Sequence, residues 1–192
     1  LLQDVFFFRL ATEALIYGAF AMGVDLLLGF AGLLSLGHAL FFGLGAYVSG
    51  LVLKEWTASF WLALAVTLLA STVAGTIAGI IAIRARGVYF ALITFGLAEV
   101  ASKVVFNTRE LGGSDGIIGI PVVQANFLFF TVDSGHAPSF FLLVLALVMA
   151  MYFALEALLQ TPAGRLVVAI KANEHRVPFL GFSAQRYKLL AF

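Results

Sequence analysis

The chain has 192 residues, of which 62% are hydrophobic and only 11% are charged, and its formal net charge is +1. Soluble domains are about 45–50% apolar and about 25% charged, and small ones still expose much of their surface. The composition therefore excludes an ordinary soluble domain and predicts several membrane spans, while a balance of +1 gives no indication of nucleic-acid binding. The absence of cysteine excludes disulfides and cysteine–metal sites.

The first predicted element is Leu10–Leu53, an apolar stretch that only Glu13, Asp25 and His38 interrupt. A helix needs about 20 apolar residues to cross the hydrocarbon core, so this stretch is long enough for two spans. Five glycines fall within Gly29–Tyr47, and each weakens a helix by about 1 kcal/mol relative to alanine. We expect either a helix break that forms a binding site, as in transporters, or a tight uncharged turn between two spans.

Four residues in or next to this stretch are candidates for the substrate path: Asp25, Ser35, Gly37 and His38. An ionisable group inside a membrane is a functional candidate by default, and Asp25 has no neighbour in sequence with which to pair. His38 fits a single structural hydrogen bond as well as a contact with substrate.

Two further spans follow. Phe60–Ile83 is an uninterrupted uncharged run, and Gly87–Phe106 carries Glu99 and Lys103 four residues apart, where the two side chains can form an ion pair. Small residues at four-residue spacing in the first of these runs predict close packing against another helix; they are Ser71, Gly75 and Gly79.

The glycine-rich stretch Leu111–Pro121 predicts a turn. Successive backbone amides in such a loop can bind an anion, so Gly113, Ser114 and Asp115 are additional candidates for the substrate path, although a plain connecting loop is the alternative. The last predicted span is Ser139–Leu155, which extends easily through Leu159.

The stretch from Gln160 to Lys188 is basic and helix-forming. Thr161 can cap a helix whose first residue is Pro162, Pro178 ends or kinks it, and Gly181 permits the turn that follows. Its five cations are Arg165, Lys171, Arg176, Arg186 and Lys188. The pattern predicts an amphipathic surface helix that binds either anionic membrane lipid or a cytosolic protein partner.

Lysine and arginine collect in cytoplasmic loops, which gives the orientation. Residues 160–188 and the turn with Arg84 and Arg86 are then inside, and Lys54–Ser59, Asn107–Pro138 and the N-terminus are outside. The sequence thus predicts an all-α fold, a polytopic transmembrane helix bundle of about five spans with one or more broken. We expect residues 1–192 to form a single transmembrane domain, and to be a fragment that lacks at least one helix at each end.

Four stretches occur in the same order as in the LivM-type permeases of branched-chain amino acid ABC importers. They are GFAGLLSLGHALFFGLGAY, RGVYFALITFGLAEV, LGGSDGI, and TPAGRLVVAIKANE followed by LGFSAQRYKLLAF. The chain resembles this family from about Leu15 to Phe192.

The resemblance implies a permease subunit of a bacterial inner membrane that imports branched-chain or related amino acids. Its implied partners are a second related permease, two cytosolic ATPases and a periplasmic substrate-binding protein. Residues 160–182 are then the cytosolic ATPase-coupling loop, with Gly164, Arg165, Glu174 and Gly181 as its coupling residues. 

This sequence departs from the family pattern at three positions. Arg176 and Pro178 stand where the family often has a small and an acidic residue, and Asp25 stands where it usually has asparagine. The first two changes affect the expected geometry of the coupling helix, and a charged Asp25 would alter the preference of the pore for ions or substrates.

Two other functions are open on the residues alone. A secondary transporter driven by protons or sodium would use Asp25, Glu99 and His38 as coupling groups. A membrane enzyme is disfavoured because His136 and His175 fall in loops on opposite sides, and we expect no catalytic residues, cofactor or metal. The chain also contains no G-x-x-x-x-G-K-[ST] sequence, so it cannot itself hydrolyse a nucleotide, and the energy for transport has to come from a partner or from a gradient.

Overall fold

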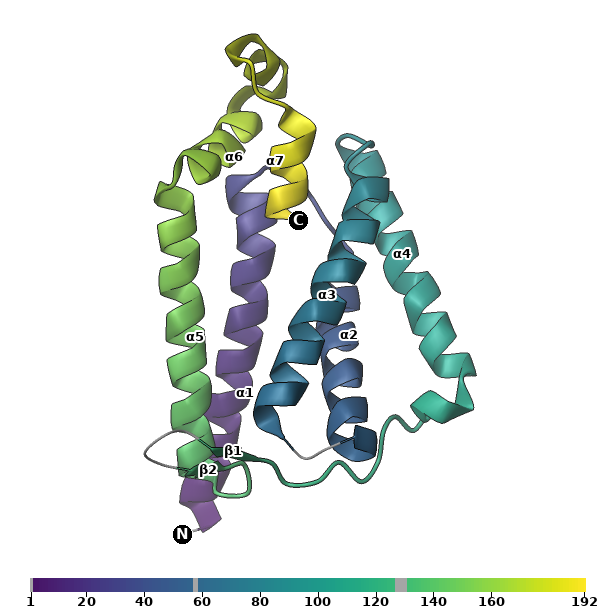
Figure 1. Ribbon diagram of the computed structural model, residues 1–192, viewed down its shortest axis with the longest axis vertical. Helices are drawn as coiled ribbons and strands as arrows, with labels where there is room; N and C mark the ends of the chain where they lie inside the picture. The colour runs from purple at the N-terminus through teal and green to yellow at the C-terminus, as the bar shows by residue number, and fades with distance from the viewer. Residues whose placement is uncertain (1, 57–58, 127–130) are drawn as a thin grey trace.

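The computed structural model describes residues 2–56, 59–126 and 131–192 (Figure 1). Its α-helices are α1 (Leu2–Asp25), α2 (His38–Leu51), α3 (Phe60–Ala82), α4 (Val88–Asn107), α5 (Ala137–Gln160), α6 (Pro162–Asn173) and α7 (Ala184–Ala191). Shorter elements are the π-helical turns η1 (Leu26–Phe30) and η2 (Val52–Trp56), the 3-10 helices η3 (Arg109–Leu111) and η4 (Glu174–Leu180), and the strands β1 (Gln124–Asn126) and β2 (Thr131–Asp133).

Four of the described helices are long and apolar enough to cross a membrane: Val5–Phe30, Phe60–Ala82, Val88–Asn107 and Ala137–Gln160. They form because long uncharged runs in lipid have to satisfy every backbone group internally. Most of their leucine, isoleucine, valine and phenylalanine side chains face outward, as expected for a bundle surrounded by lipid. The predicted all-α polytopic bundle is confirmed.

The first apolar stretch forms two helices, as predicted, but they are unequal. The first starts before Leu10 and continues through η1, whereas α2 has only 14 residues before η2 extends it. An extended segment, residues 31–37, connects them and runs back beside the first half of α4 (Figure 1). The second helix, α2, was expected to be a full span, but it is short and is preceded by a non-helical segment inside the bundle.

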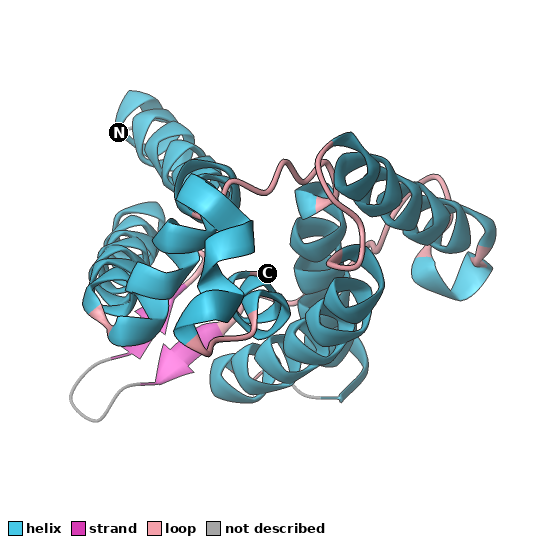
Figure 2. Ribbon diagram, turned by 90° about the horizontal axis from the view of Figure 1, so that it is seen from above, coloured by secondary structure: helices cyan, strands magenta, loops and turns pink. Residues whose placement is uncertain are grey.

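The helices form two groups. The first is α1 with α5, which lie side by side, and the second is α2, α3 and α4 (Figure 1). We call the end of the bundle that carries α6 the α6 end, and the opposite end, which carries β1 and β2, the hairpin end. Seen from above, α7 and the C-terminus lie between the two groups (Figure 2).

The hairpin was not predicted. β1 and β2 pair antiparallel, with Ala125 opposite Val132. The indole Nε1 of Trp61, at the start of α3, donates a hydrogen bond to the carbonyl of Asn126 at 2.8 Å. Part of the connection Asn107–Pro138, which was predicted to lie outside the membrane, is thus ordered against the helix bundle.

The buried core lies at the α6 end. Its members are Leu27, Ala31, Leu33, Ala82, Phe90, Val167 and Ala191. Gly79 of α3 faces α7 there: a Cβ on it would come within 2.6 Å of Leu189 Cδ1 and 2.9 Å of Phe192 Cδ1. The close helix approach predicted from the small-residue stripe is confirmed at Gly79, since a larger residue would force the Leu189 and Phe192 side chains to move.

Candidate functional site

The basic segment, which we define as residues 161–188, begins at a sharp corner between α5 and α6. Thr161 Oγ1 accepts a hydrogen bond from the Gly164 backbone N–H at 3.1 Å and donates one to the Leu158 carbonyl at 2.6 Å. Pro162 occupies the first helical turn. The predicted N-cap is confirmed, and it satisfies a backbone donor that the helix itself leaves free.

Two of the predicted coupling residues lie in this corner. Gly164 is buried, and a Cβ there would meet the Leu158 carbonyl and come within 2.5 Å of Leu159 Cα, so no larger residue fits. Arg165 donates from Nε and Nη2 to the carbonyl of Gln160, at 3.3 and 3.2 Å. Both residues therefore set the direction in which α6 leaves α5.

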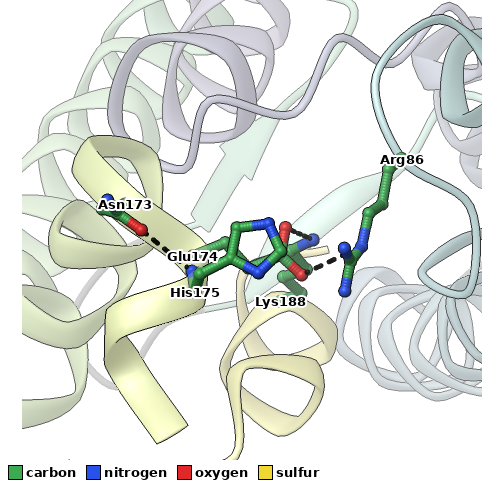
Figure 3. A network of polar contacts seen from close by, with 5 residues as sticks. All are labelled: Arg86, Asn173, Glu174, His175 and Lys188. Atoms are coloured by element: carbon green, nitrogen blue, oxygen red, sulfur yellow. Dashed lines mark hydrogen bonds and ion pairs between the residues drawn. The ribbon is translucent and has the colours of Figure 1, made fainter. Parts of the chain in front are cut away.

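Glu174 lies at the centre of an ion-pair network (Figure 3). Its Oε2 is 2.6 Å from Lys188 Nζ, and its Oε1 is 3.7 Å from Arg86 Nε. The Lys188 side chain is only 3% exposed, whereas that of Arg86 is 65% exposed. A buried ammonium group requires a paired anion, and removing one partner of such a pair costs about 3–5 kcal/mol. Glu174 thus joins η4 to α7 and to the turn between α3 and α4.

The far end of the basic segment forms an exposed apolar tip. Asn173 Oδ1 accepts a hydrogen bond from the His175 N–H at 3.1 Å and caps η4. Beyond it, the tip consists of Phe179, Leu180 and Phe182, which are 89%, 66% and 42% exposed.

Gly181 makes the turn within this tip. Its φ of +80° is accessible to glycine at little cost, and nothing lies within 4 Å of the position of a Cβ. The turn predicted at Gly181 is confirmed, and it presents the apolar tip to the surroundings of the bundle.

The basic segment is also attached to the end of α1. Lys171 Nζ of α6 donates a hydrogen bond to the Gly29 carbonyl in η1. Gly32, with a φ of +70°, lies directly beneath the Lys171 side chain, where a Cβ would come within 2.8 Å of Lys171 Cγ. Gly29 and Gly32, two glycines of the first apolar stretch, therefore form the surface on which α6 packs.

The extended segment 31–37 holds two of the predicted substrate-path residues, Ser35 and Gly37, and packs on α4. The Leu36 N–H donates to Thr94 Oγ1 at 3.1 Å, and Thr94 Oγ1 donates to the Ala91 carbonyl at 3.0 Å. Gly37 lies against the same residue, since a Cβ would come within 2.6 Å of the Thr94 carbonyl oxygen. The Leu36 N–H, which the break frees, is thus satisfied by a protein side chain, as the membrane interior requires.

Ser35 and His38 flank this contact. Ser35 is buried, and its Oγ accepts a hydrogen bond from the Gly37 N–H at 3.3 Å. His38 is the first residue of α2 and packs edge-on against Phe20, with ring centroids 6.3 Å apart. Its Nδ1 is buried without a partner among the described residues. A buried polar atom of this kind is a site where substrate or water can bind.

The other predicted path residues lie elsewhere. Asp25 is exposed at the α6 end of α1. The turn of Gly113, Ser114 and Asp115 follows the far end of α4, and the Ser114 hydroxyl donates to Asp115 Oδ1 at 3.1 Å. The structure therefore brings Ser35, Gly37 and His38 together but leaves Asp25 and this turn outside that group.

A cavity of about 480 Å³ lies near the hairpin end, between α2, α3, α5 and the hairpin strands. Its walls are mostly aliphatic and include Ala63, Ile120 and Leu143. Thr67 Oγ1 is buried there with no hydrogen-bond partner among the described residues. Sequence reasoning missed Thr67, because a threonine within an apolar helix gives no signal of what faces it.

The ionisable groups suggested for a gradient-driven carrier do not gather. Glu99 pairs with Lys103 at 3.7 Å, and both side chains are more than half exposed. The predicted ion pair is confirmed. Among the described residues, no group of three or more His, Cys, Asp or Glu side chains could hold a metal ion.

Comparison with known proteins identifies one family and two relatives of the same kind. The model of the family described as "Branched-chain amino acid transport system / permease component" matches residues 6–192. The high-affinity branched-chain amino acid transport system permease protein LivM of Escherichia coli K12 is 31% identical over 95% of this chain, and that of Salmonella typhimurium LT2 is 32% identical over 95%. The chain spans about half, 48%, of the length of these two relatives. No solved structure matches it.

Proposed function

Because the chain belongs to the family of permease components of branched-chain amino acid transport systems, as its motifs predicted, we propose that it works as a transmembrane subunit of an ATP-binding-cassette importer. In this function it forms part of the path for branched-chain or related amino acids, and separate ATPase subunits supply the energy. The observation that carries the proposal is the family match over residues 6–192, which includes the complete basic segment.

The orientation proposed from the sequence agrees with the positions of the charges in the fold. The α6 end carries Arg84 and Arg86 as well as the five cations of the basic segment. Because lysine and arginine collect on the cytoplasmic side, we place the α6 end in the cytoplasm and the hairpin end outside. In a bacterial inner membrane, the hairpin end then faces the periplasm and is the end that a substrate-binding protein can reach.

The exposed tip supports contact with a cytosolic ATPase. Phe179 and Leu180 are among the most exposed apolar side chains of the described residues, and such side chains commonly mark sites of protein–protein contact. The Gly164–Arg165 corner and the Glu174 network hold the segment that carries this tip. A tip carried by a braced segment can transmit the movement of a partner to the membrane helices.

The features suited to transport lie deeper in the bundle. The break that precedes α2 lies next to His38, whose buried Nδ1 has no partner among the described residues. The cavity near the hairpin end contributes the unpartnered Thr67 hydroxyl and aliphatic walls. Breaks of this kind form binding sites in transporters. The aliphatic walls suit a substrate with a branched apolar side chain, and a second permease subunit would complete the path.

The test uses the full-length protein in its native membranes. It is captured under mild detergent, and ATPase activity is measured in the eluate, together with ATP-driven uptake of labelled leucine, isoleucine and valine. Co-purification of an ATPase and ATP-dependent uptake are expected. Uptake that needs an ion gradient but neither ATP nor a partner would overturn the proposal in favour of a secondary transporter.

A matched pair of variants tests the role of the tip. Gly181→Trp places a bulky side chain in the tip and is expected to abolish ATPase co-purification while membrane insertion stays normal. Gly119→Trp is the control, since Gly119 has a φ of +83° and equally free surroundings but precedes β1. Equal ATPase recovery from both variants would contradict docking at the tip.

A further inference from the structure

The basic segment connects the two helix groups at the α6 end. It continues α5, and Lys171 fastens it to the end of α1, so it contacts the first group at two places. Its last helix, α7, packs on Gly79 of α3, and Glu174 reaches Arg86 in the turn between α3 and α4. Movement of this segment is therefore transmitted to both groups.

The two ion pairs of Glu174 differ greatly in strength. The pair with Lys188 is short, at 2.6 Å, and the lysine side chain is only 3% exposed to solvent. Breaking it would leave a buried charge without a partner, which is strongly unfavourable. The pair with Arg86 is long, at 3.7 Å, and the arginine is 65% exposed. Exposed pairs of this kind are weak and are screened by salt.

The surroundings of Arg86 also leave it free to move. Two cavities of about 380 Å³ each border on Arg86, Glu174 and His175. A guanidinium that leaves Glu174 can therefore enter solvent without displacing the packed core. Lys188 borders one of these cavities as well, but its side chain is only 3% exposed and is held by its short pair with Glu174.

On the basis of the proposed function, we propose that Arg86 is a positioning residue for transport, whose contact with Glu174 opens and re-forms in each cycle. While it is made, this contact ties η4 to the turn between α3 and α4 and holds the two helix groups together at the α6 end. The Lys188–Glu174 pair persists throughout and keeps α6, η4 and α7 moving as one unit. A pull on the basic segment by a partner separates the weak pair before the strong one.

Cross-linking tests whether this contact has to open. Residues 1–192 contain no cysteine, and any cysteine elsewhere in the full-length protein is first replaced by serine. Arg86→Cys combined with His175→Cys then introduces two thiols beside Glu174 while its pair with Lys188 is kept. The full-length variant, assembled with its ATPases, is treated with a short bifunctional methanethiosulfonate. Uptake is expected to be lost on cross-linking and to return on reduction, whereas each single-cysteine variant treated in the same way keeps its uptake.

Neutralisation tests the energetic role of the same contact. Arg86→Gln is expected to raise the ATP hydrolysed per substrate imported by about two- to five-fold, the range that corresponds to an exposed ion pair, with unchanged ATPase co-purification. High salt should bring the wild-type ratio toward that of the variant. Arg84→Gln is the control, because Arg84 is exposed in the same turn and forms no ion pair within the described part of the chain.

Charge exchange separates the two pairs. Glu174→Lys alone should lose ATPase co-purification, and adding Lys188→Glu should restore it by rebuilding the buried pair. The variant with both Glu174→Lys and Lys188→Glu should still hydrolyse more ATP per substrate imported than the wild type, because the introduced lysine side chain repels Arg86. Adding Arg86→Glu should lower this ratio to the wild-type value.

Undiminished uptake by the cross-linked protein, or equal ATP ratios for Arg86→Gln and Arg84→Gln, would overturn this inference while leaving the proposed function intact. Failure of the wild-type protein to show ATP-driven uptake would overturn the proposed function and this inference with it.

Discussion

Thr94→Val isolates the hydrogen bond that holds the extended segment 31–37 on α4. Thr94 is 1% exposed, and its hydroxyl accepts from the Leu36 N–H and donates to the Ala91 carbonyl. Valine has nearly the same shape, so the packing is kept and the Leu36 N–H loses its acceptor. An unsatisfied buried donor costs about 1–3 kcal/mol. Since this N–H is only partly buried, we expect a loss of stability of about 1–2 kcal/mol.

In a protein of about 150–250 residues 1 kcal/mol shifts the Tm by about 2–4 °C, and in a longer one by less, so the Tm of full-length Thr94→Val should fall by a few degrees, about 8 °C at most. The assay is thermal unfolding of the full-length protein in detergent, with amide hydrogen exchange at Leu36 as a local readout. Thr94→Ser keeps the hydroxyl and should keep the protection of the Leu36 amide. Thr72→Val is the control, because within the described part of the chain the Thr72 hydroxyl bonds only to the Leu68 carbonyl, on an exposed face of α3. Unchanged protection at Leu36 in Thr94→Val, with a Tm equal to that of the control, would refute this account of the break.

Three further substitutions test other contacts. Gly164→Ala places a Cβ against the backbone of the α5–α6 corner, and this overpacking should lower the free energy of unfolding by about 1–3 kcal/mol. Gly18→Ala is the control and should cause no loss of stability, because nothing lies within 4 Å of its new Cβ. Similar Tm values for the two variants in thermal unfolding would contradict the tight corner. Glu99→Gln removes an exposed pair with Lys103 and should change the free energy of unfolding by less than about 0.5 kcal/mol, so a larger change would indicate an unrecognised role. Asp25→Asn should leave the rate and the substrate profile of uptake unchanged, because Asp25 is exposed at the end of α1; an altered profile would place this side chain on the substrate path.

Much of the fold could be predicted because its signals are local. Long uncharged runs fix where helices form in lipid, and α3, α4 and α5 lie within a few residues of the predicted ranges. The Thr161 cap and the Gly181 turn depend on chemistry within four residues and were also predicted correctly. The substrate-path candidates stayed in the groups that they form in the sequence: Ser35, Gly37 and His38 lie together at the break, and Gly113, Ser114 and Asp115 share one turn elsewhere.

The sequence by itself determined that this chain is a membrane-embedded helix bundle with a capped basic helix after α5, since hydropathy and capping act over one or a few helical turns. Only the tertiary structure decided what the charged and polar groups contact. Glu174 meets Arg86, a residue far back in the chain, and Leu36 meets Thr94. Such pairs depend on how distant helices cross, and hydropathy, which is nearly uniform along these helices, does not specify which faces meet. The cavity near the hairpin end that contains Thr67 also depends on how distant helices cross, because it lies where α2, α3 and α5 pack without filling the space between them.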